Sequence, residues 1–143
     1  MKRQRTLLSL VVAAGMAFSG VAAAHGAETL GAGDVVKPNF SHAIQNSPGK
    51  SLVAVEVFYP PGGASLPHTH AKSAFIYAYV VSGSIASKVN DEPEHIYKAG
   101  EAFFEEPGSR HPVNRNASKT QPAKLLAVFV VDSNDKELTT PLK

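Results

Sequence analysis

The feature that most constrains the fold is a series of short apolar runs, separated by Gly and Pro turns, with no helical segment among them. Turns such as residues 60–63, 82–83 and 99–100 punctuate the series. Runs rich in β-branched and aromatic residues favour strands, and Gly and Pro end them. The expected strands are residues 52–59, 74–81, 84–90, 94–98, 101–105 and 124–132. Strands at this spacing predict an all-β sandwich or barrel.

The last of these runs, residues 124–132, is apolar without a clear period. Such a pattern is typical of a strand that is covered on both faces or that forms a barrel wall. Before the first run, residues 25–50 are polar and predict an N-terminal arm with one edge strand near residues 33–37. Residues 51–132 are then the barrel domain, and residues 133–143 are expected to form a polar C-terminal tail.

The N-terminus has the pattern of a secretory signal peptide. A basic start is followed by a short apolar core and by the small-residue exit Ala22-Ala23-Ala24. We expect cleavage after Ala24, with an exit near Gly26 or Ala27 as the alternative, and a periplasmic or secreted location. The apolar core is short for a membrane span, so no membrane association is expected after cleavage.

Composition narrows the partners of the mature chain. Removing Lys2, Arg3 and Arg5 from the 14 basic residues leaves 11 against 12 acidic residues, so no basic surface for nucleic acid is expected. The chain has no cysteine, which excludes disulfides and thiolate ligands. Exposed strand edges of small barrels are commonly covered by pairing, so a homodimer is one expectation for the assembly.

Two histidines, His68 and His70, are separated by one residue after the turn at residues 60–63. Side chains alternate along an extended segment, so both imidazoles point to the same side. With a third imidazole from elsewhere, the pair would make a site for a divalent transition metal. The same pattern also occurs in ordinary loops, so the pair alone does not decide between the two interpretations.

The order of strands, His-x-His, Gly turns and Pro-Gly-x-x-His resembles the cupin superfamily, whose fold is a small jelly roll or double-stranded β-helix barrel. The first cupin motif is Gly, five residues, His-x-His, three or four residues, Glu, six residues, Gly. The residues that match it are Gly62, His68, His70 and Gly83. The second motif is Gly, five residues, Pro-x-Gly, two residues, His, three residues, Asn. The residues that match it are Gly100, Gly108 and His111.

The resemblance covers about residues 50–132 and implies that His68, His70 and His111 converge on one metal ion at the barrel mouth. It also implies a first-motif glutamate that this chain lacks. That ligand would fall at Ala74 or Phe75 counting from His70, and at Ile76 counting back from Gly83.

Glu105, next to the Pro-Gly turn, is the expected stand-in for the missing ligand and is better placed than Glu106 to remain on a strand. The alternative is a solvated turn glutamate, which would leave a three-histidine site similar to that of the thiol-dioxygenase branch of the cupins. Of the remaining histidines, His42 and His95 are expected at the surface or in structural roles. His25 would bind copper only if cleavage made it the mature N-terminus.

An imidazole-rich site suits Fe, Mn, Ni, Cu or Zn without selecting among them. The resemblance implies a metal-dependent dioxygenase or a related enzyme acting on a small molecule, with Glu105 as ligand or general base. A non-catalytic periplasmic module that binds a metal or small ligand is the alternative. The segment between Gly83 and Gly100 is too short to hold a large lid or substrate domain, which favours a small ligand.

Overall fold

Eleven β-strands make up the part of the chain that the computed structural model describes, residues 33–143. The expected signal peptide and His25 lie outside these residues. The strands are β1 (Val35–Ala43), β2 (Lys50–Tyr59), β3 (His68–His70), β4 (Phe75–Ser82), β5 (Ser84–Lys88), β6 (His95–Lys98), β7 (Ala102–Glu105), β8 (Arg110–His111), β9 (Val113–Asn116), β10 (Ala123–Asp132) and β11 (Thr139–Pro141). The predicted all-β cupin-type jelly roll is confirmed. Within residues 33–143 we find no helical segment with the length and apolarity that a membrane crossing requires.

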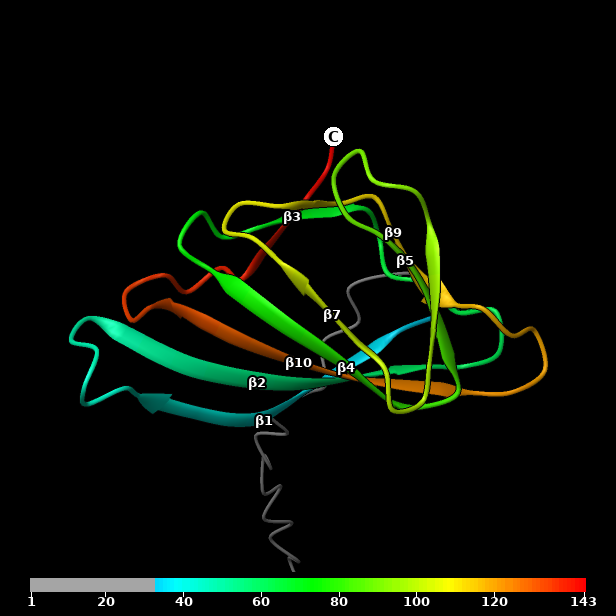
Figure 1. Ribbon diagram of the computed structural model, residues 1–143, viewed down its shortest axis with the longest axis horizontal. Coiled ribbons are helices and arrows are strands. Elements are labelled where there is room, and N and C mark those ends of the chain that lie inside the picture. Colours follow the sequence, from blue (N-terminus) through cyan, green and yellow to red (C-terminus); the bar gives the residue numbers. More distant parts are fainter. Residues whose placement is uncertain (1–32) are drawn as a thin grey trace, which may run out of the picture.

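A five-stranded antiparallel sheet, in the order β1-β2-β10-β4-β7, forms one wall of the barrel. Two three-stranded sheets, β11-β3-β8 and β6-β5-β9, complete it. Figure 1 shows the long strands β2, β10 and β4 running side by side along the lower part of the molecule, with β3, β5 and β9 above them. The space between these walls holds the apolar core and the histidines.

Strands β4 and β10 bury every second side chain over most of their length, as one-sided packing of a sheet requires. In β4, Ile76 and Ala78 are buried, whereas Tyr77 between them is exposed. In β10 the alternation runs along the whole strand, so of the two alternatives the strand forms a barrel wall and is not buried on both faces. Apolar residues also occupy its outer face, where they are half-buried, and they conceal the period in the sequence.

The C-terminal segment contributes a strand to the histidine-bearing sheet. β11 pairs antiparallel with β3, and Thr139 lies opposite His70 in the register. The Leu138 carbonyl also accepts a hydrogen bond from the Ala71 backbone amide at 3.1 Å. Within the described residues, the first and last strands thus lie in different sheets: β1 is an edge strand of the large sheet, and β11 lies beside the strand that carries His68 and His70.

We expect Gly83→Ala to destabilise the fold by about 3 kcal/mol or more. Gly83 has a φ of 74°, and a Cβ there would stand 2.5 Å from the Pro122 carbonyl oxygen. The left-handed backbone alone costs an L-residue about 1–2 kcal/mol, and the clash adds to it. Gly100→Ala is the matched control, because Gly100 has a φ of 91° but an added Cβ meets nothing within 4 Å. Equal losses in denaturant unfolding of the two variants would contradict the clash.

Candidate metal centre

Three imidazoles from two adjacent strands of one small sheet converge on the interior of the barrel. His68 and His70 lie on β3, and the β3–β8 pairing places His111 directly across from His68. Their candidate ligand nitrogens all lie within 4.8 Å of one another. His70 and His111 are buried, whereas His68 is half-buried at the edge of the group. The structure thus brings together the three histidines that the two motifs indicated, and we call them the histidine cluster.

Glu105 ends β7 with its side chain turned inward, and its carboxylate faces two members of the cluster. Its Oε2 lies 3.0 Å from His70 Nε2, and its Oε1 lies 3.2 Å from His111 Nδ1. The residue is 3% exposed, whereas its neighbour Glu106 is exposed. Glu105 therefore reaches the cluster from a neighbouring strand and is not a solvated turn glutamate.

The hydrogen bonds of the rings decide which nitrogens are free. His68 Nδ1 lies 2.7 Å from the Leu66 carbonyl oxygen, and His70 Nδ1 lies 3.4 Å from that of Leu138. A carbonyl only accepts, so each Nδ1 carries the hydrogen and each Nε2 of a neutral ring presents a lone pair. His111 differs, because Ser87 Oγ lies 2.8 Å from its Nε2 while its Nδ1 faces Glu105.

Two buried atoms of the site have no hydrogen-bond partner among the described residues: His70 Nε2 and Glu105 Oε2. They face each other at 3.0 Å without the angle of a hydrogen bond. With the hydrogen of a neutral His70 on Nδ1, a lone pair opposes a carboxylate oxygen, which is unfavourable in a buried place. A cation beside both atoms would resolve this opposition, so the residues present fit a divalent metal.

The surroundings favour the ligand forms of these side chains. Burial lowers the pKa of His68 to about 4, against the opposing effect of its hydrogen bond to Leu66, so the ring is neutral at pH 7. For Glu105, burial by itself raises the pKa, but the side chains around it, His111 first among them, outweigh this effect and hold the pKa at about 2. The centre thus offers a neutral imidazole and an ionised carboxylate over the whole physiological range.

The position of Glu105 relates directly to the missing first-motif ligand. Ile76, one of the positions where that glutamate was expected, pairs with Glu105 in the β4–β7 register. Both side chains are buried and line the same small cavity as the histidine cluster. Glu105, on the adjacent strand β7, therefore places its carboxylate in the cavity that Ile76 also lines.

The cavity beside the histidine cluster has a volume of about 50 Å³. One side is apolar, with Val57, Leu125 and Phe129 among its lining residues. Four polar residues that the sequence analysis did not single out also line it: Asp34, Tyr59, Ser65 and Asn114. No motif connects them, because they are brought together from β2, β9 and two loops. Their burial could be found only in the folded chain.

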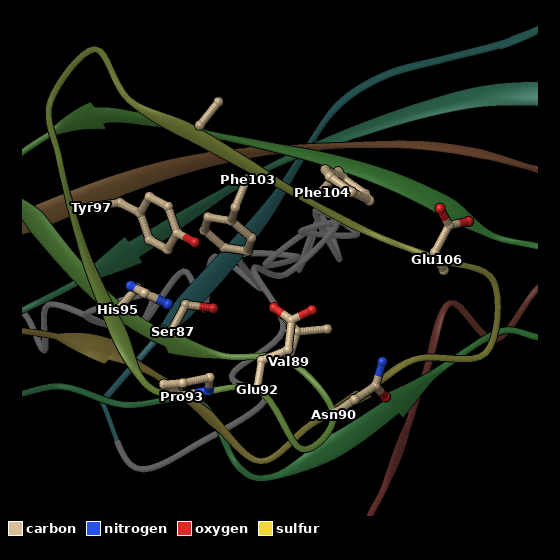
Figure 2. A pocket seen from close by; sticks show the side chains of 11 residues that line it. Ser87, Val89, Asn90, Glu92, Pro93, His95, Tyr97, Phe103, Phe104 and Glu106 are labelled. Carbon is tan, nitrogen blue, oxygen red and sulfur yellow. The ribbon is translucent and has the colours of Figure 1, made fainter.

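A larger hollow of about 290 Å³ lies on the other side of Ser87. Figure 2 shows Tyr97 and Phe103 side by side in its wall, with Glu92, from the turn between β5 and β6, pointing into the hollow. His95 lines this hollow and is exposed, and His42 is exposed on β1, as expected for residues outside the cluster. Ser87 and Phe103 connect the hollow with the cluster, because both also contact His111.

Comparisons with known proteins agree with this architecture. The family described as "Cupin domain" matches residues 55–129, just over half of the chain. The crystal structure of TT1209 from Thermus thermophilus superposes with a TM-score of 0.55 at 26% identity, covering 69% of this chain and 84% of that one. A search among curated proteins gives no match.

Two further solved structures share the fold at lower identity. The cupin domain of Cnp3 from Schizosaccharomyces pombe is 19% identical with a TM-score of 0.57, covering 70% of this chain and 66% of that one. Oxalate oxidase in complex with the substrate analogue glycolate is 22% identical with a TM-score of 0.55, covering 69% of this chain and 51% of that one. This chain thus spans about half the length of oxalate oxidase, and at these identities the likeness is one of fold.

Proposed function

The chain belongs to the cupin family, and from this premise we propose that it is an exported metal-binding cupin that acts on a small organic molecule. The observation that carries the proposal is the convergence of three imidazoles and one carboxylate on a buried cavity, with His70 Nε2 and Glu105 Oε2 unpartnered among the described residues. Export is supported by the signal-peptide pattern of residues 1–24. The fold neighbour oxalate oxidase acts on a small organic acid, in keeping with a small ligand here.

The residues that would hold the metal are His68, His70 and His111, with Glu105 as the fourth ligand. Bound there, a divalent Fe, Mn, Ni, Cu or Zn ion would supply Lewis-acid chemistry, and a redox-active one would also supply electron transfer. The carbonyls of Leu66 and Leu138 would fix the tautomers of His68 and His70, as backbone carbonyls commonly do for metal-binding imidazoles. His111 would have to give up one of its two present partners to serve as a ligand.

The protein's own groups would orient a ligand and exclude bulk water. If Glu105 stays outside the ligand set of the metal, its buried carboxylate would instead accept a hydrogen bond from the ligand through Oε2 and so orient it. The apolar side of the cavity, which includes Val57 and Phe129, excludes bulk water and strengthens electrostatic interactions within it. These features suit a metal-dependent dioxygenase or a related small-molecule enzyme.

A non-catalytic periplasmic module that binds a metal or a small ligand is the second candidate. The cavity volume of about 50 Å³ favours it, because that space holds only a few water-sized groups beside an ion. Such a module would keep the same four metal-binding residues. It would differ in showing no turnover.

The test is metal reconstitution of the mature chain followed by oxygen uptake. We expect about one divalent transition metal per chain by elemental analysis, since one histidine cluster offers one site. A metal-free preparation that cannot be reconstituted would contradict the proposal. Oxygen uptake with small aromatic diols, diketones or thiols, above that of metal-free protein, supports the dioxygenase. Silence with every loaded metal supports the binding module.

A further inference from the structure

A directed chain of hydrogen bonds runs along the polar side of the cavity. Ser65 Oγ donates to Asp34 Oδ2 at 2.7 Å, so the hydroxyl of Tyr59, 2.7 Å from Ser65 Oγ, is the donor to Ser65. Burial raises the pKa of Tyr59 well above its usual value, which keeps the hydrogen on this phenol. The donors of both hydroxyls are thus used within the wall, and the chain ends at Asp34.

What remains unsatisfied on this side is a pair of acceptors. Asp34 Oδ1 and Asn114 Oδ1 are buried and have no hydrogen-bond partner among the described residues. Asp34 is 0% exposed and Asn114 is 8% exposed. Ser65 connects them, because its amide donates to the Asn114 backbone carbonyl at 2.9 Å while its hydroxyl donates to Asp34. Burial without a partner deprives both oxygens of the hydrogen bonds that they would make with water, which destabilises the folded chain.

These acceptors line the same cavity as the histidine cluster and Glu105. A ligand in this cavity meets metal-binding groups and, elsewhere on the wall, oxygens that can only accept. A ligand that also presents only oxygen lone pairs to Asp34 would be repelled there. One that presents a hydroxyl or amine hydrogen would satisfy the unpaired oxygens.

We propose that Asp34 and Asn114 form a subsite for the hydrogen-bond-donating end of a small ligand whose other end reaches the metal centre. The inference rests on the proposed function and deepens it, because it names the class of ligand: a small acid that carries a hydroxyl or amino group. Asp34 and Asn114 are specificity-determining residues in this assignment, and Ser65 with Tyr59 positions Asp34.

The test uses two probes of nearly equal size, glycolate and fluoroacetate, which differ in the presence of a donor hydrogen. Both are titrated into the Co(II)-loaded protein, and dissociation constants are read from the visible absorption spectrum of the cobalt. We expect glycolate to bind about tenfold more tightly than fluoroacetate, the effect of one hydrogen bond to a charged group. Asp34→Asn keeps an oxygen for Ser65 and turns an amide NH2 toward the cavity, so this preference should fall to about one or reverse.

Cobalt content and the far-UV circular dichroism of Asp34→Asn should equal those of the wild type. If the substitution prevents folding, Asn114→Leu removes the second acceptor and should lower the preference in the same direction. Absence of cobalt from the wild type would refute the proposed function. Three results with cobalt-loaded protein would overturn the subsite: equal dissociation constants for the two probes, the same preference in a folded variant as in the wild type, or no saturable spectral response to either probe. A water molecule would then be the partner of these acceptors.

Discussion

Replacing His68 and His111 together with alanine lowers the affinity for a divalent transition metal at least about 100-fold. The two residues lie opposite each other on β3 and β8, so the double change removes imidazoles from both strands of the centre. Loss of even an indirect partner of a metal ligand typically costs 10–100-fold, and the loss of two ligands costs more. Affinity is measured by competition with a chelating indicator, and bound metal by elemental analysis.

The fold should survive this double substitution. Both apolar core clusters consist of other residues, drawn mainly from β2, β4 and β10. Loss of the His111 ring leaves a small void and takes a buried partner from Ser87 and Glu105, so we expect a cost of about 3–5 kcal/mol in the metal-free protein. His95→Ala is the matched control, because His95 is exposed and outside the cluster. Full metal affinity in the double variant would show that the wrong residues have been assigned.

Much of the fold could be predicted because the residue types within each run, and the Gly or Pro that ends it, indicate where the strands of the large sheet lie. Runs such as residues 52–59 and 74–81 are β-branched and aromatic and end at Gly or Pro, which is sufficient to locate β2 and β4. The histidine cluster could be predicted for a different reason. His68 and His70 share one short strand. The spacing of the two motifs predicts that His111 lies near them, so the course of the chain between residues 71 and 110 did not have to be known.

The parts that could not be predicted depend on contacts between distant segments. β11 is only Thr139–Pro141, a polar stretch whose strand conformation comes from pairing with β3. Its neighbour Leu138 supplies the carbonyl that faces His70 Nδ1, so the expected tail lies against the centre. Asp34 lacks any local signal of burial, and its carboxylate accepts a hydrogen bond from Ser65, which is 31 residues away in the sequence.

Replacing Glu105 with glutamine is the change we expect to affect both metal binding and the acid stability of the fold. An amide cannot give the charge that a carboxylate gives to a metal ion, and its NH2 would donate a hydrogen bond to the Nε2 lone pair of His70 that a metal needs. We expect metal affinity to fall at least about tenfold if Glu105 only orients the imidazoles, and about 100-fold or more if it is a ligand. Chelator competition on the variant measures the difference.

The metal-free protein gives a second measurement of the same residue. The pKa of Glu105 is about 2 in the folded state and 4.5 for the free side chain, so the unfolded state binds the additional proton as the pH falls below 4.5. Its contribution to stability is thus present above pH 4.5 and is lost toward pH 2, by an amount on the order of 2 kcal/mol. Denaturant unfolding at pH 5 and pH 3 should show a smaller loss for Glu105→Gln than for the wild type.

Glu106→Gln is the control for both measurements, because Glu106 is the adjacent carboxylate and is exposed. It should bind metal like the wild type and lose the same stability between pH 5 and pH 3. If Glu105→Gln and Glu106→Gln behave alike in both experiments, the centre consists of the histidines alone. The carboxylate facing His70 would then be a packing residue, and a three-histidine centre would remain. If only Glu105→Gln changes, a carboxylate opposite Ile76 takes the role that the family assigns to its first-motif glutamate.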